Sequence, residues 1–148
     1  MSTPFACPIC LKPLSREDNS LRCPGRHTFD VAREGYVNLL LKKPGGLYED
    51  KALFEARRAA YRAGFFTPLA EAVLPFVRPG TVVDAGCGEG SLLFALSAGG
   101  ACRGIGVDIA RPAVRLAARS YPGLFWCVGD VCGLPLPDGA ADTLVNVL

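Results

Sequence analysis

The sequence lacks the features of membrane-inserted and exported proteins. None of its apolar runs reaches the roughly 18 residues that a membrane-spanning helix needs. Its start, Met-Ser-Thr-Pro-Phe-Ala-Cys-Pro, does not have the basic and then apolar layout of a signal peptide. We therefore expect a cytoplasmic protein without membrane contact.

The chain has little net charge, and its charged residues are unevenly distributed. The formal net charge is +2 over 148 residues. Residues 1–43 carry seven Lys and Arg against four Asp and Glu, whereas residues 44–148 carry nine against ten. A mildly basic amino-terminal part permits contact with a polyanion but does not by itself establish it.

Histidine occurs once, at His27, while cysteine occurs seven times. An odd number of cysteines without an export signal favours a metal site over disulfides, because cytosolic thiols stay reduced. Cys7 and Cys10 form a CxxC pair, and Cys23 and His27 follow with three residues between them. This spacing predicts one closed tetrahedral zinc site of structural type. A redox CxxC pair is the alternative, but it would have no use for Cys23 and His27.

Short alternating segments surround the four expected ligands. Thr28–Ala32 and Tyr36–Leu40 are strand-like and are separated by a turn, which suits a small ribbon of hairpins around the metal. Lys42–Gly46 then breaks the periodicity. We expect a zinc-binding lobe for RNA recognition over 1–43, a linker and helices over 44–80, and the amino-terminal part of a cofactor-binding domain over 81–148.

Two helices are expected in the connecting part. Glu49–Arg62 contains no Gly or Pro and stops before Gly64. Thr67 and Pro68 are suited to an N-cap and a first helical residue, and the pattern predicts a helix from there to Val77.

A strand, an acid and a glycine turn follow in immediate succession. Three β-formers lead into Asp84, and Gly86, Gly88 and Gly90 come directly after it, followed by an apolar run that suits a helix. Glycines let the backbone approach a ligand closely, and the first turn of a helix offers free N–H groups. This order predicts a ligand-binding turn.

Strands and helices alternate beyond the turn. Residues 103–108 and 124–130 are strand-like and end in Asp108 and Asp130, and another strand begins at Ala141. The fold class expected is α/β, a parallel sheet with helices on both faces, with ligands at the carboxyl ends of the strands. A row of arginines in the intervening helix, Arg111, Arg115 and Arg119, is expected to face solvent, with RNA contact as the alternative.

These motifs resemble those of the class I S-adenosylmethionine-dependent methyltransferases: Val-Asp-Ala-Gly-Cys-Gly-Glu-Gly, then Gly-Val-Asp, then Val-Gly-Asp. The resemblance implies that the first motif holds the methionine part, that the second acid binds the ribose, and that the third motif binds the adenine. In that family an aromatic residue ahead of the first motif lines the cofactor site. The cofactor-binding residues implied are Phe66, Asp84, Gly86, Gly88, Glu89, Gly90, Asp108, Asp130 and Val131.

Together with the zinc ligands and the segment Phe29–Leu40, the whole chain resembles the large-subunit (23S) ribosomal RNA (guanine-N1)-methyltransferases. The resemblance implies methyl transfer from S-adenosylmethionine to guanine N1 in a 23S rRNA hairpin, with a zinc lobe that helps to recognise RNA and with homodimers. No residue stands out as the catalytic base. The sequence ends within the expected fourth strand, before the family's active-site motif, so we expect an incomplete fragment without turnover.

Other functions remain open from the sequence. A zinc-dependent RNA-binding module without catalysis would bind RNA but no cofactor. A small-molecule methyltransferase would share the core and differ in its methyl acceptor. A nicotinamide-binding enzyme is disfavoured because the third glycine comes one position too early for G-x-G-x-x-G.

Overall fold

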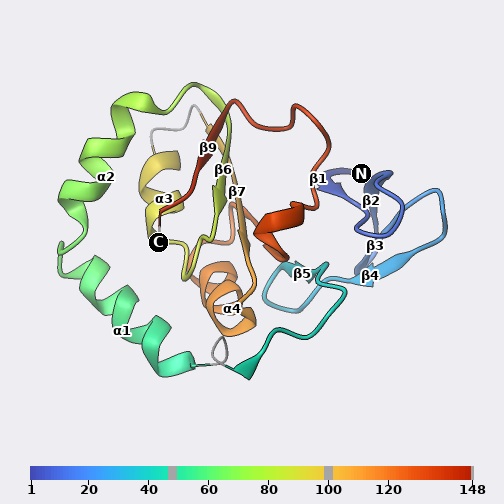
Figure 1. The fold of residues 1–148 in the computed structure, drawn as a ribbon, viewed down its shortest axis with the longest axis horizontal. Coiled ribbons are helices and arrows are strands. Elements are labelled where there is room, and N and C mark those ends of the chain that lie inside the picture. Colours follow the sequence, from blue (N-terminus) through green and yellow to red (C-terminus); the bar gives the residue numbers. More distant parts are fainter. Residues whose placement is uncertain (47–49, 99–101, 148) are drawn as a thin grey trace.

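A computed structural model describes residues 1–46, 50–98 and 102–147 of the chain (Figure 1). Its amino-terminal part is an antiparallel sheet in the order β1-β2-β3-β4. The strands are β1 (Ser2–Ala6), β2 (Pro13–Glu17), β3 (Ser20–Arg22) and β4 (Thr28–Asp30). We call residues 1–30 the ribbon. Asp18, at φ 51°, lies in the two-residue turn between β2 and β3, a left-handed conformation that Asp tolerates.

The second sheet has five parallel strands in the order β5-β8-β7-β6-β9. They are β5 (Tyr36–Asn38), β6 (Gly80–Ala85), β7 (Cys102–Asp108), β8 (Phe125–Val128) and β9 (Thr143–Val145). Val83 of β6 pairs with Ile105 of β7 on one side and with Leu144 of β9 on the other. The α/β fold class and its parallel sheet are confirmed.

The placement of β5 differs from the expectation. The hairpin expected for Tyr36–Leu40 is reduced to one antiparallel bridge, between Val31 and Val37. Instead, β5 pairs in parallel with β8, with Tyr36 opposite Trp126. Tyr36 and Val37 are 3% and 2% exposed, so consecutive residues that point to opposite faces are both buried. A strand of a sheet covered on both faces has this property, whereas a ribbon hairpin would leave one face to solvent.

The helices are α1 (Lys51–Arg62), α2 (Thr67–Val73), α3 (Ser91–Ser97) and α4 (Arg111–Ser120). Asp50 caps α1 by accepting from the N–H of Leu53, and the expected start at Glu49 lies outside the described residues. The expected N-cap Thr67 is already the first residue of α2, and no side chain caps that helix. The helix expected to reach Val77 ends earlier and continues as a short 3-10 turn, η2 (Leu74–Phe76), which contains Pro75.

Each face of the parallel sheet packs against a different layer. Val82, Trp126 and Val128 point toward α3 and α4, whereas Val83, Ile105 and Cys127 point toward the ribbon. Figure 1 shows the ribbon strands on one side of the sheet and α1, α2 and α3 on the other. The N–H of Ala6 also donates to the carbonyl of Pro135, in the loop after β8. The ribbon and the sheet therefore share one continuous core.

Among the described residues, no helix is both long and apolar enough to cross a membrane.

Candidate metal centre and cofactor site

Two tight turns of the ribbon carry the four expected metal ligands. Cys7 and Cys10 lie between β1 and β2, and Cys23 and His27 lie between β3 and β4. The N–H of Leu11 donates to the carbonyl of Cys7, which closes the first turn at 2.8 Å. A corresponding bond from Arg26 to Cys23 closes the second turn, and both donors have left-handed φ values. The backbone itself therefore aims each ligand pair.

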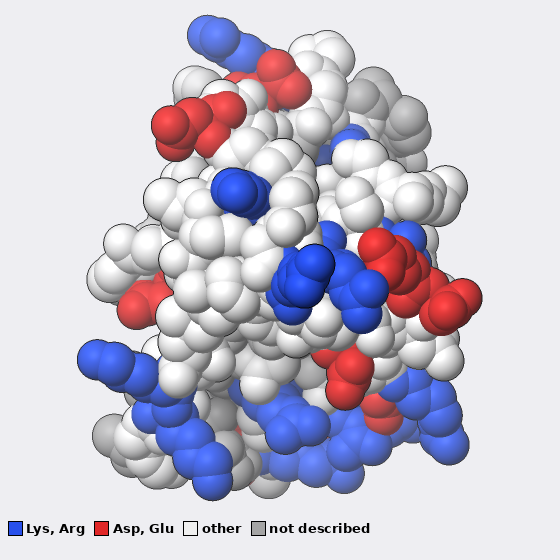
Figure 2. Space-filling view, turned by 90° about the vertical axis from the view of Figure 1, so that its right-hand side faces the viewer, with Lys and Arg blue, Asp and Glu red and all other residues white. Residues whose placement is uncertain are grey.

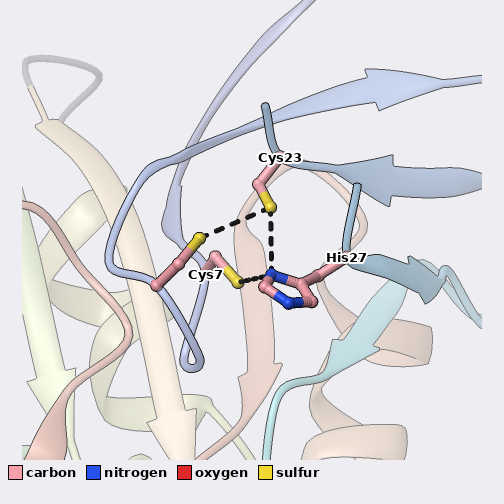
Figure 3. Close-up of side chains that lie close together, drawn as sticks. Cys7, Cys23 and His27 are labelled. Atoms are coloured by element: carbon pink, nitrogen blue, oxygen red, sulfur yellow. Dashed lines mark hydrogen bonds between the residues drawn. The ribbon is translucent and has the colours of Figure 1, made fainter. Parts of the chain in front are cut away.

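The four ligand atoms converge on one point (Figure 3). Nδ1 of His27 lies 3.4 Å from the Sγ atoms of both Cys7 and Cys23, and the Sγ atoms of Cys10 and Cys23 lie 3.5 Å apart. Zinc–sulfur bonds of about 2.3 Å in a tetrahedron place ligand atoms roughly 3.5–3.8 Å from one another. The set is thus arranged to bind one metal ion, and its three thiols and imidazole suit zinc. Within the described chain it is the one such cluster of His, Cys, Asp and Glu.

The glycine turn joins β6 to α3, and its conformation depends on glycine. Gly86, Gly88 and Gly90 have φ values of 89°, 53° and 87°. A Cβ atom on Gly90 would lie 2.5 Å from the Trp126 ring and 2.8 Å from the Cβ of Ala117. The turn therefore packs directly onto β8 and α4, which fixes the start of α3.

Asp108, at the end of β7, is bonded to the glycine turn. Its carboxylate accepts from the N–H of Gly88 and from the N–H of Ala110, both at 2.8 Å. The side chain is only partly buried. The structure thus brings Asp108 beside the turn, as expected, and it also gives this residue a bracing role that sequence reasoning missed.

Asp84 and Glu89 are buried carboxyl groups at the base of the turn. Asp84 is 1% exposed, and its Oδ1 has no hydrogen-bond partner within the described residues. Burial, together with the charges of Asp108 and Glu89, raises the pKa of Asp84 to about 7. Glu89 is 3% exposed and accepts from the N–H and hydroxyl of Ser91, and burial raises its pKa despite those bonds. Two buried acids at one place favour a cationic ligand.

A narrow cavity connects these acids to α1 and α2. Phe66 lines it together with Asp84, Gly86 and Glu89, as the resemblance implied. The Phe66 ring stacks on Tyr61 with centroids 4.7 Å apart. Arg57 lines the same cavity and makes no hydrogen bond or ion pair within the described residues. The sequence alone did not place Arg57 or Tyr61 at this cavity, because only the fold shows which face of α1 meets the turn.

Asp130 and Val131 lie one strand further along the same edge of the sheet. Asp130 accepts from the N–H of Cys132 and so caps η3 (Val131–Gly133), while Val131 is 41% exposed. The N–H of Gly129 donates to the carbonyl of Asp108, which joins the two strand ends. Neither Asp130 nor Val131 lines the narrow cavity, so their expected contact with an adenine remains a prediction.

Asn146 is a further polar residue at this edge that sequence reasoning missed. It follows β9, and its side-chain amide donates to the carbonyl of Ala85 at 2.7 Å. A polar residue directly after a strand was the available signal. Asn146 therefore holds the end of β6, from which the turn begins.

Comparison with known proteins assigns both parts of the chain. Residues 5–42 match the zinc-ribbon family described as "RlmA, N-terminal", and residues 82–148 match the family described as "Methyltransferase domain". A 23S rRNA (guanine(748)-N(1))-methyltransferase of Streptomyces fradiae is 42% identical over 95% of this chain and 54% of its own length. A Bacillus subtilis protein described as a 23S rRNA (guanine-N(1)-)-methyltransferase is 38% identical over 97% of this chain and 55% of its own. The chain spans about half the length of these relatives.

A solved structure supports the fold. A Methanococcus maripaludis protein described as an S-adenosyl-L-methionine-dependent methyltransferase superposes with a TM-score of 0.59 at 20% identity. The alignment covers 72% of this chain and 53% of that one.

Proposed function

We propose that the chain belongs to the family of the 23S rRNA (guanine-N1)-methyltransferases and takes part in methyl transfer from S-adenosylmethionine to N1 of a guanine in a 23S rRNA hairpin. We further propose that the zinc-bound ribbon contacts the RNA and that the protein acts in the cytoplasm. The observation that carries the proposal is the unpartnered, buried Asp84 carboxylate beside the glycine turn.

The charges in the narrow cavity suit the end of a ligand that carries both a positive and a negative group. Asp84 and Glu89 offer carboxylates, and Arg57 offers a guanidinium that has no ion pair within the described residues. The methionine end of S-adenosylmethionine carries an ammonium and a carboxylate, so it can neutralise both signs at once. We assign the ammonium to Asp84 and the carboxylate to Arg57, whose fork matches a carboxylate in two hydrogen bonds.

The remaining cofactor contacts follow the strand ends. Asp108 keeps acceptor capacity after its two backbone bonds and is assigned to the ribose hydroxyls. Asp130 and Val131 are assigned to the adenine, and Phe66 to the wall of the cofactor site. The glycine turn allows close approach of the backbone to the cofactor.

Methyl transfer depends more on aligning the methyl group with guanine N1 than on activating either group. The sulfonium of the bound cofactor supplies an electrophilic methyl group. Transfer of that methyl group to guanine N1 would require the two groups to be held in line and a base to take the N1 proton. The residues described here hold and orient the cofactor, and none of them is assigned as the base.

The RNA contact is supported by charge on the ribbon side. Figure 2 shows this side of the molecule, where Lys and Arg side chains gather in a band along the lower edge. An aromatic or basic surface is needed as well to hold a guanine outside its helix.

The test combines binding and transfer. The zinc-loaded protein is incubated with radiolabelled S-adenosylmethionine and a 23S rRNA segment that contains guanine 748, the guanine named for the Streptomyces relative. Primer extension then locates any N1-methylguanine, because this methyl group blocks base pairing. Binding of both the labelled cofactor and the RNA segment is the expected result, with any transferred label at guanine N1, and label in small acceptors alone would contradict the proposal. RNA binding without cofactor binding would favour the zinc-dependent RNA-binding module instead.

A further inference from the structure

A second cavity, of about 520 Å³, lies against α4 and shares no lining residue with the narrow cavity. It forms where the segment that leads from the ribbon into β5 meets α1 and α4. We call it the α4 pocket. Its polar and charged lining consists of Glu34, Tyr36, Lys51, Arg111, Arg115 and Arg119. Four cations and one acid therefore face one space, from three separate elements.

The single acid is already engaged by one of the arginines. Oε1 of Glu34 accepts from Nε of Arg115 at 2.8 Å and lies 2.7 Å from its Nη2. The Glu34 side chain is 13% exposed, while the Arg115 side chain is 58% exposed. Glu34 thus fixes the direction of the Arg115 guanidinium and leaves part of it open to solvent.

Two of the other cations, Lys51 and Arg119, keep donors that can reach a ligand. Arg111 donates from Nε to the Tyr36 hydroxyl at 3.0 Å, which positions its guanidinium at the wall. Lys51 pairs with Glu55 at 3.5 Å on the exposed surface of α1, a pair that solvent weakens. Arg119 is exposed at the last turn of α4. The α4 pocket therefore carries a net positive charge that its own carboxylate does not cancel.

The spacing of the arginines favours an extended polyanion over a single small anion. Arg111, Arg115 and Arg119 recur every four residues, so each step advances about 6 Å along the helix. This step is similar to the separation of neighbouring phosphates in one nucleic-acid strand. A guanidinium also binds phosphate oxygens in a forked geometry.

The start of α4 lies next to the glycine turn. Asp108 accepts from Ala110, which precedes Arg111, and from Gly88 of the turn. A strand that follows the arginines from Arg119 to Arg111 would therefore run toward the cofactor site. Figure 2 shows Lys and Arg side chains gathered along the lower edge of the molecule, seen from the side on which the ribbon lies.

We propose that the α4 pocket binds the sugar-phosphate backbone of the RNA substrate and directs that strand toward the glycine turn. This inference rests on the proposed function, because it takes the RNA to be the substrate. The arginine row is exposed, as expected, and the inference adopts RNA contact, the alternative that the sequence left open for it.

The test measures RNA affinity as a function of salt. A fluorescein-labelled RNA hairpin that contains the guanine 748 segment is titrated with zinc-loaded protein, and fluorescence anisotropy gives the dissociation constant. The variants Arg119→Gln and Lys51→Gln are each expected to weaken binding roughly three- to tenfold at low salt. Each is also expected to reduce the slope of log K against log salt by about 0.7, the value for one lost phosphate contact on a single strand.

Arg62→Gln serves as the matched control, because Arg62 is an exposed arginine at the opposite end of α1 from Lys51. It removes the same charge and is expected to keep the affinity within about twofold and the slope unchanged. Glu34→Gln provides a gain-of-binding test: it releases Arg115, so binding should tighten and the slope should steepen, which misfolding cannot produce.

Two results would overturn the inference in different ways. If the wild-type protein binds the hairpin and Arg119→Gln and Lys51→Gln behave like Arg62→Gln, the α4 pocket does not bind RNA, while RNA recognition itself stands. If the wild-type protein does not bind the hairpin, the RNA part of the proposed function fails together with this inference.

Discussion

At the scale of single residues, Asp84 makes the pH dependence of the free protein informative. Its pKa is about 7 in the folded protein and would be near 3.9 in the unfolded chain. The folded state therefore binds the proton more tightly, so this group's contribution to stability falls as pH rises from about 4 through about 7. An ammonium group of a ligand would pair with the Asp84 carboxylate and so offset the free-energy cost of its buried charge.

Asp84→Asn removes this titration. We compare the free energies of unfolding of the variant and the wild type. The variant's value should rise relative to that of the wild type by about 1 kcal/mol between roughly pH 6 and pH 8. Urea unfolding of both zinc-loaded proteins, followed by Trp126 fluorescence, measures the difference. Asp138→Asn, at a surface loop position, is the control. A constant difference across this range would mean that Asp84 does not titrate there.

Arg57 offers a second residue-scale prediction, about the methionine end of the cofactor. Arg57→Ala should weaken S-adenosylhomocysteine binding about 10- to 100-fold, because hydrogen bonds between charged groups are worth roughly 1.5–3 kcal/mol. Methylthioadenosine lacks the amino-acid end, so its affinity should not change. Calorimetry with both ligands separates the two effects, and Arg62→Ala is the matched control. Equal losses for both ligands would remove the assignment of Arg57 to the carboxylate.

At the scale of elements, the glycine turn is the junction most sensitive to substitution. Gly90→Ala would force a left-handed residue and drive a Cβ into Trp126 and Ala117, so we expect a loss of about 2–5 kcal/mol. Gly88→Ala meets nothing within 4 Å and should cost only about 1–2 kcal/mol, from its φ of 53°. Thermal or urea unfolding compares the two, and equal losses would contradict the packing at Gly90.

Local patterns were sufficient to predict the elements whose signals are local. Gly86, Gly88 and Gly90 mark their turn in the sequence itself, and the Cys and His spacing marks the metal ligands. The partner of β5 was not predictable in this way, because Val37 pairs with Cys127, about 90 positions later. The position of Arg57 at the narrow cavity was not predictable for the same reason, because it depends on which face of α1 covers the turn. Thr67 was misassigned as the N-cap of α2. The N-cap is Phe66, and this follows from the backbone geometry rather than from a capping side chain.

At the scale of the whole molecule, the metal and the parallel sheet are coupled through shared packing. The ribbon buries Phe5, Leu14 and Leu21 in the same cluster as Val83 and Ile105. Loss of zinc from the ribbon should therefore uncover one face of the sheet as well.

Chelation tests this coupling. We expect a chelator to remove one zinc ion per chain and to lower the unfolding temperature by roughly 10 °C. The readout is Trp126, which is buried on the opposite face of the sheet and so reports on the sheet rather than on the ribbon. Cys10→Ser should reproduce the shift without chelator. An unchanged Trp126 transition would show that the two layers unfold independently.

The pairing of β5 with β8 has a consequence for the order of events during synthesis. The ribbon and its four ligands leave the ribosome first, whereas β8 follows about 90 residues later, which takes roughly 5–20 s at ordinary elongation rates. During this interval the apolar face of the ribbon that later packs against the parallel sheet stays uncovered. A metal ion captured early would keep the nascent ribbon in shape until its docking surface has been made.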